Sequence, residues 1–129
     1  MAYRIYLVDD DRFLLDLYAV KFKNAGHEVT AFSGGEELLA ALRKKGDAPD
    51  AILLDVIMPG MDGFGVLEVM RKESLAGKSK VIVLSNQGQE ADIEKAKSLG
   101  ATSYIVKASA IPSEVLTQTL SAIEGTPHS

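Results

Sequence analysis

Short strand-like runs alternate with helical runs along the whole chain, and this alternation restricts the possible folds more than any other feature. The strand-like runs are rich in branched and aromatic residues, and the segments between them have apolar residues at helical spacing. Strands are predicted at 3–8, 27–32, 51–56, 80–85 and 103–107, and helices at 12–25, 34–46, 64–74, 90–100 and 112–124. Strict alternation with short connections predicts an α/β fold, in which a parallel sheet carries helices on both faces.

The composition excludes several classes of function. The chain of 129 residues suits one domain over 1–129, with a short C-terminal tail at 125–129. If this is the full length, we expect a stand-alone domain without an output domain, and if it is part of a longer protein, the output lies elsewhere. Without cysteine, it has no thiol nucleophile, thiolate zinc site or disulfide. A net charge of -4 offers no basic surface for direct nucleic-acid binding. The N-terminal segment is neither a signal peptide nor a membrane span, so a cytoplasmic protein without membrane contact is expected.

Charged and hydroxyl side chains stand at the carboxyl ends of four predicted strands. They are Asp9, Asp10 and Asp11 after the first strand, Asp55 at the third, Ser85 at the fourth and Lys107 at the fifth. Taken singly, each could be a helix cap, a turn residue or a solvated side chain. In a parallel α/β sheet, however, ligands bind at the carboxyl ends of the strands. These side chains are therefore expected to form one site.

The chemistry expected of this site is phosphoryl transfer to a carboxylate. Converging carboxylates favour a cation among them, and ligands that are all oxygen select a hard ion such as Mg²⁺. Mg²⁺ held by two or three carboxylates leaves room for a phosphoryl group, so Asp55 could attack a phosphodonor and form an acyl phosphate. Lys107 would pair with one phosphate oxygen, and the Ser85 hydroxyl would hydrogen-bond another.

Four segments together resemble the receiver domain of bacterial two-component response regulators. They are "LVDDDR", "AILLDVIMPGMDGFGVL", "VIVLS" and "SYIVK", in this order, and the resemblance extends from Arg4 to about Ile123. It implies a doubly wound, flavodoxin-like sheet with strand order 2-1-3-4-5. It also implies a phosphorylation-dependent switch that receives its phosphoryl group from a histidine kinase or phosphotransfer protein and controls a downstream protein partner. Such a domain promotes its own phosphorylation and dephosphorylation but is not a turnover enzyme.

The resemblance assigns a role to each matching residue of the acidic site. Asp55 would be the phosphoacceptor and, with Asp10, a carboxylate ligand of Mg²⁺. Asp9 would act mainly through a metal-bound water, and the backbone carbonyl of Ile57 would complete the protein ligands. Asp11 falls outside this metal set, and we assign it to capping of the first helix.

The remaining matches are a switch and a phosphate ligand. Ser85 would be the switch hydroxyl that moves toward the phosphoryl group, and Tyr104 would be the aromatic residue that changes rotamer as Ser85 moves. Without the resemblance, Tyr104 is a half-buried strand residue whose role is packing. Lys107 would be the phosphate-binding lysine.

Some positions depart from the family pattern. Asn86 is larger than the residue that receivers usually have at this position, and it could narrow access to Asp55. Ile57 and Gln87 stand at positions that tune phosphoryl lifetime in such domains, and neither carries a charge. Ala108 stands where receivers have a proline after a cis peptide bond. A cis bond costs about 2.5 to 4 kcal/mol before a residue other than proline, against about 0.5 to 1 before proline. We nevertheless expect a cis Lys107-Ala108 bond, because it directs the lysine toward the site.

Three alternatives remain open. An aspartyl-nucleophile, phosphatase-like hydrolase would want a second acid two residues after Asp55, where Ile57 stands. A flavin-binding module would need a phosphate-cradling loop after the first strand, where "DDDR" would repel phosphate. The third alternative is a protein-interaction module that works without phosphorylation. Turnover of a phosphate ester would indicate the hydrolase, and a coloured preparation would indicate the flavin-binding module. Failure to accept phosphate would indicate the interaction module.

Overall fold

The computed structural model describes residues 2–44, 48–56, 60–75, 77–85, 89–107 and 111–125. Five strands and five helices alternate in these ranges, as predicted, with ends that differ by a few residues. In chain order they are β1 (Arg4–Val8), α1 (Arg12–Asn24), β2 (Glu28–Phe32), α2 (Gly35–Arg43), β3 (Ala51–Asp55), α3 (Gly63–Lys72), β4 (Lys80–Ser85), α4 (Glu90–Ser98), β5 (Ser103–Val106) and α5 (Pro112–Glu124).

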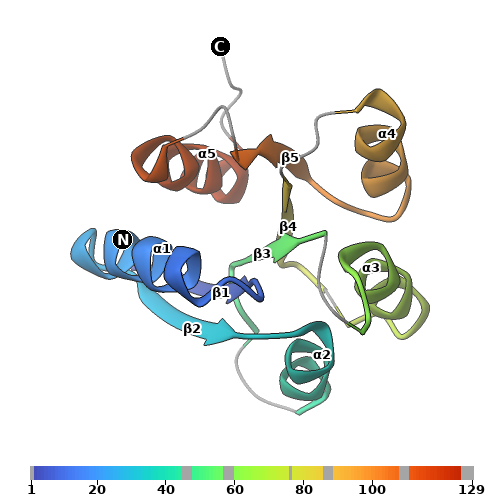
Figure 1. Ribbon diagram of the computed structural model, residues 1–129. Coiled ribbons are helices and arrows are strands. Elements are labelled where there is room, and N and C mark those ends of the chain that lie inside the picture. Colours follow the sequence, from blue (N-terminus) through green and yellow to red (C-terminus); the bar gives the residue numbers. More distant parts are fainter. Residues whose placement is uncertain are drawn as a thin grey trace.

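The strands form one parallel sheet in the order β2-β1-β3-β4-β5, which confirms the predicted fold class. In Figure 1, α1 and α5 cover one face of the sheet, and α2, α3 and α4 cover the other. The chain reverses its direction of winding between β1 and β3. In doubly wound folds this switch point is where a crevice opens at the carboxyl ends of the strands. Among the described helices, none has the length and apolar character needed to span a bilayer.

The central strand β3 is buried along its whole length because both faces of the sheet are covered. Its side chains alternate between two hydrophobic clusters. Ile52 and Leu54 pack with residues of α2, α3 and α4, whereas Ala51 and Leu53 pack with residues of α1 and α5. This explains why the third predicted strand is apolar throughout until it ends at Asp55.

Two aspartates act as helix caps, Asp11 at α1, as predicted, and Asp62 at α3. The Asp11 carboxylate accepts hydrogen bonds from the backbone N–H groups of Phe13 and Leu14, at 3.0 and 3.2 Å. The Asp62 carboxylate accepts one from the N–H of Gly65 at 2.9 Å. Both aspartates satisfy N–H groups that have no partner within the first turn of their helix.

The first residue of α3 lies directly against the end of β3. The N–H of Gly63 donates to the carbonyl of Val56 at 2.7 Å. A Cβ at Gly63 would stand 2.5 Å from the carbonyl oxygen of Asp55 and 2.8 Å from the Cα of Val56. Glycine is therefore needed here for close approach of two backbone segments, and this approach sets the position of Asp55.

Replacing Gly63 with alanine should destabilise the protein by about 1 to 3 kcal/mol, because the new methyl group would displace backbone rather than a flexible side chain. The matched control is Gly65→Ala on the same helix, where the new Cβ meets a side-chain atom, Cγ of Met61 at 3.2 Å, rather than backbone. Alanine's higher helix propensity offsets that contact, so the control should stay within about 1 kcal/mol of wild type. Urea unfolding midpoints measure both effects. Equal stabilities of the two variants would contradict the close-approach argument.

Candidate functional site

The carboxyl edge of the sheet brings together side chains that are far apart in the sequence. Asp9 follows β1, Asp55 ends β3, and Lys107 follows β5. The Lys107 Nζ lies 2.7 Å from Asp9 Oδ2 and 3.2 Å from Asp55 Oδ1. The exposed fraction of the side chain is only 7% for Lys107, 5% for Asp9 and 8% for Asp55. One buried ammonium group therefore bridges two buried carboxylates, as the convergence of the strand ends predicted.

The charges of this cluster do not balance, and the excess is negative. Burial and the neighbouring Asp9 carboxylate raise the pKa of Asp55 to about 6, although Lys107 acts in the opposite direction. Burial alone would lower the pKa of Lys107, but its hydrogen bond to Asp9 and the charges of both aspartates outweigh burial and raise it. At neutral pH the ammonium is charged, and the Asp55 carboxylate is ionised at an energetic cost.

Three carboxylates are close enough to share a metal ion. Asp9, Asp10 and Asp55 each offer an oxygen, and these oxygens all lie within 4.8 Å of one another. Asp10 is exposed, whereas the other two are buried. Both oxygens of Asp9 already have partners, since Oδ1 accepts from the N–H of Asp11 at 2.9 Å and Oδ2 contacts Lys107. The donor set is all oxygen and has excess negative charge, so it fits a hard divalent cation.

The two expected switch residues lie on neighbouring strands and on the same face of the sheet. Ser85 ends β4 and is buried. Val83, two residues before it, packs in the cluster beneath α3 and α4, and half-buried Tyr104 of β5 packs against the same cluster. Because side chains alternate along a strand, Ser85 is directed to that face as well. Val83 and Tyr104 are partners in the parallel register.

Tyr18 is a residue near the site that reasoning from sequence did not identify. Tyr18 is buried in the cluster beneath α1 and α5. Burial raises the pKa of its hydroxyl, and the charges of Lys107, Asp9 and Asp55 also act on it. No sequence pattern indicated that its hydroxyl lies within range of those charges, because the proximity depends on how α1 packs on the sheet.

Several residues named from the sequence lie outside the described ranges. Ile57 was expected to offer a carbonyl to the metal ion and to tune the lifetime of the phosphoryl group. Asn86 was expected to tune access to Asp55, and Gln87 the phosphoryl lifetime. The peptide bond before Ala108 was expected to be cis. Their assignments stay predictions.

Fold and site together define a doubly wound α/β domain with an acidic pocket and a lysine at the carboxyl edge of its sheet. Comparison with known proteins identifies the family. The family profile described as "Response regulator receiver domain" matches residues 5–120. The chain therefore belongs to the receiver domain family of response regulators, which confirms the resemblance seen in the sequence.

Individual relatives agree with this assignment. Protein PilH of Pseudomonas aeruginosa is 31% identical over 121 residues, which cover 93% of this chain and 96% of that protein. The probable transcriptional regulator ycf27 of Pyropia yezoensis is 36% identical over 104 residues, or 81% of this chain but only 41% of that protein. The chain thus spans less than half the length of such longer relatives.

Solved structures show the same fold. Chemotaxis protein CheY4 of Vibrio cholerae has a TM-score of 0.84 at 26% identity, with 95% of this chain and 99% of that chain covered. A CheY-like receiver domain protein of Methanospirillum hungatei has a TM-score of 0.85 at 25% identity, with 98 and 97% covered.

The raised pKa of Asp55 predicts a dependence of stability on pH. Its ordinary pKa is 3.8 and the folded value is about 6, so between these values the folded state binds more protons than the unfolded chain. Stability should therefore fall as pH rises from about 4 to about 6 and stay lower above that. Without divalent ions at pH 7, Asp55→Asn should unfold with a free energy higher by roughly 1 to 3 kcal/mol than wild type, a gain that disappears toward pH 4.

Urea unfolding at both pH values measures this difference. Asp11→Asn is a matched control, because it removes the same charge two residues from Asp9 and keeps an equally good helix cap. The control should show little change at either pH. A wild type that is more stable than Asp55→Asn at pH 7 without divalent ions would contradict the prediction.

Proposed function

We propose that this receiver domain is a signalling switch that accepts a phosphoryl group on Asp55 from a histidine kinase or phosphotransfer protein with Mg²⁺, and then controls a downstream protein. The observation that carries this proposal is the buried contact of Lys107 with Asp9 and Asp55, beside exposed Asp10. A structural ion pair would need one carboxylate. The second carboxylate leaves a negative excess that a metal ion can neutralise, and it supplies a nucleophile for a phosphoryl group.

Asp55 is suited to act as the nucleophile. Its carboxylate is ionised above a pKa of about 6, so its oxygen can attack phosphorus at neutral pH. The new bond joins a carboxylate oxygen to phosphorus, and the bond from phosphorus to the donor breaks, with its electron pair leaving on the donor. Lys107 already contacts one Asp55 oxygen at 3.2 Å, so its ammonium group can turn to hold a phosphoryl oxygen.

Asp9, Asp10 and Asp55 would hold Mg²⁺, together with the carbonyl of Ile57. When bound, the ion neutralises charge between the acids and the incoming phosphoryl oxygens. Exposed Asp10 and the Asp55 carboxylate can offer oxygens directly. Asp9, with both oxygens engaged, is better placed to act through a water molecule. A cavity of about 290 Å³ beside Asp10 is also lined by Glu36 and Glu37, so a phosphate would be repelled there unless a cation were present.

The conformational change that follows phosphorylation would be transmitted on the face of the sheet that α4 covers. Ser85 is directed to that face from β4, and Tyr104 packs on the same face from β5. Movement of the Ser85 hydroxyl toward a phosphoryl group would open space that the Tyr104 ring could enter. Such a protein changes state once for each phosphorylation, so its role is that of a switch rather than of a turnover enzyme.

Intact-mass measurement after incubation with acetyl phosphate and Mg²⁺ tests the chemistry. Wild type should gain the mass of one phosphoryl group, and the gain should disappear in Asp55→Asn and when Mg²⁺ is chelated, because nucleophile and charge neutralisation are both needed. Asp11→Asn should keep the gain, since Asp11 only caps α1. A gain in Asp55→Asn, or no gain in wild type with any donor, would contradict the proposal. Repeated hydrolysis of a phosphate ester would instead indicate the hydrolase alternative.

The outer face of α1 supports a protein as the natural phosphodonor. Phe13, Leu17 and Val20 are 75, 41 and 56% exposed. Their spacing of four and three residues places them on one side of the helix. Since α1 begins directly after Asp10 and Asp11, this apolar stripe adjoins the acidic site. An apolar stripe beside a site that must receive a phosphoryl group suits the docking of a protein whose phosphorylated side chain reaches Asp55.

Replacing Phe13 with serine should slow phosphoryl transfer from a protein donor about tenfold or more at subsaturating concentrations, because exposed aromatic residues often dominate binding. The rate with acetyl phosphate should not change, since this small donor needs no docking surface. Lys23→Ser, near the far end of α1, serves as a control that should leave both rates near wild type. The measurement uses any purified kinase or phosphotransfer protein that phosphorylates wild type. An equal loss with acetyl phosphate would show that Phe13 acts on the site itself.

A further inference from the structure

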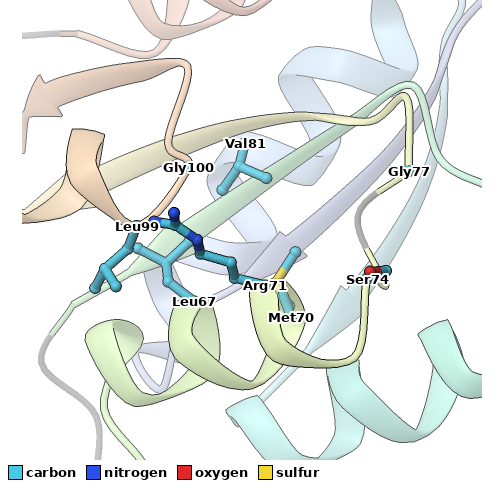
Figure 2. Close-up of a pocket in the computed structure, with 8 residues that line it drawn as sticks. All are labelled: Leu67, Met70, Arg71, Ser74, Gly77, Val81, Leu99 and Gly100. Carbon is cyan, nitrogen blue, oxygen red and sulfur yellow. The ribbon is translucent and has the colours of Figure 1, made fainter.

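A second cavity lies at the opposite end of the sheet from the acids. Its volume is about 340 Å³, and its lining residues are Leu67, Met70, Arg71, Ser74, Gly77, Val81, Leu99 and Gly100. Figure 2 shows these residues around the space between α3, the start of β4 and the turn after α4. Val81 lies near the start of β4, whereas Asp55 pairs with Leu84 near the strand's end. The cavity is therefore separate from the proposed phosphorylation site.

The floor of the cavity is apolar. Leu67, Met70 and Val81 belong to the hydrophobic cluster beneath α3 and α4, and Leu99 packs against it. Gly77 and Gly100 line the cavity without side chains, and a Cβ built at either glycine would meet no atom within 4 Å. Leu67, Met70 and Val81 are only 2 to 3% exposed, so a small molecule would meet them at the bottom of the cavity, with partly buried Leu99 beside it.

One charged side chain, Arg71, is present among the described lining residues. Figure 2 shows it extending from α3 toward Leu99 and Gly100. One guanidinium nitrogen, Nη1, donates to the carbonyl of Ser98 at the end of α4. A guanidinium group has five N–H donors, so others remain for a ligand. Within the described ranges no carboxylate forms an ion pair with Arg71, unlike Arg43, which is paired with Glu73.

From these contacts we infer that the cavity binds a small organic monocarboxylate whose apolar body rests on Leu67, Met70 and Val81 while its carboxylate pairs with Arg71. The planar guanidinium matches a carboxylate through two parallel hydrogen bonds. The single charged lining residue favours one carboxylate rather than a polyanion. A volume near the lower end of the usual range for ligand pockets, roughly 300 to 1,000 Å³, favours a small ligand over a nucleotide.

Such a ligand would touch two helices at once. Leu67, Met70 and Arg71 belong to α3, whereas Leu99 and Gly100 form the turn that follows α4. Arg71 already joins them through Ser98, and Lys95 of α4 lies 4.6 Å from the ring centroid of Phe64 on α3. A bound carboxylate would add contacts to both sides, so it would favour the arrangement in which α4 stays close to α3.

Titration of the ¹⁵N-labelled, unphosphorylated protein with 4-phenylbutanoate, followed by two-dimensional NMR, tests the inference. Saturable shifts are expected at the backbone amides of Gly77, Leu99 and Gly100, with a Kd on the order of 1 mM or somewhat lower. The neutral isostere 4-phenylbutanamide should bind at least about fivefold more weakly, because it cannot form charge-assisted bonds with Arg71.

Two variants test whether Arg71 is the residue that binds the carboxylate of the ligand. Arg71→Gln should weaken 4-phenylbutanoate binding about five- to tenfold and leave the amide nearly unaffected. Lys72→Gln removes the same charge from the next residue of α3, which does not line the cavity, and should bind as wild type does. Equal binding of acid and amide, equal loss in both variants, shifts confined to other parts of the protein, or no saturable shift would each overturn the inference.

Discussion

The contact of the Lys107 ammonium with the carboxylates of Asp9 and Asp55 is the interaction on which the rest of this structure depends. These groups come from the ends of three strands and are almost completely buried. A buried charge is tolerated only when it is paired and hydrogen-bonded, so the two carboxylates depend on the Lys107 ammonium to stay buried in their ionised form. The sheet must therefore bring the ends of β1, β3 and β5 to one edge, and the parallel order β2-β1-β3-β4-β5 does this.

The chemistry of this cluster explains why the protein tolerates the energetic cost of burying a second carboxylate. Two carboxylates facing one ammonium leave a negative excess, which raises the pKa of Asp55 to about 6. An ion pair optimised for stability alone would not retain a second buried carboxylate. The receiver domain family, to which the chain belongs, accounts for this second carboxylate through phosphorylation-based signalling, and the proposed metal ion would neutralise the negative excess. The apolar clusters on both faces of the sheet keep the site rigid.

The two ends of the molecule differ in chemistry for a reason that lies in the fold. Helices of a doubly wound sheet begin near the carboxyl edge and end near the opposite edge. Acidic caps such as Asp11 and Asp62 therefore gather with the site, while Arg71 and Lys72 lie in the last turn of α3. This separation places Arg71, which forms no ion pair within the described part of the chain, beside an apolar cavity at the opposite end from Asp9, Asp10 and Asp55.

The sequence alone determined the alternation of elements, the parallel fold and the residues at the strand ends. Hydrophobic period, capping residues and turn residues are local signals, so the expected role of Asp11 as a cap was readable from its position. Only the tertiary structure decided which atoms meet. The contact of Lys107 with specific oxygens of Asp9 and Asp55, the influence of the site's charges on Tyr18, and the cavity beneath Arg71 all join segments distant in sequence. Their geometry depends on strand register and helix packing, which no local pattern contains.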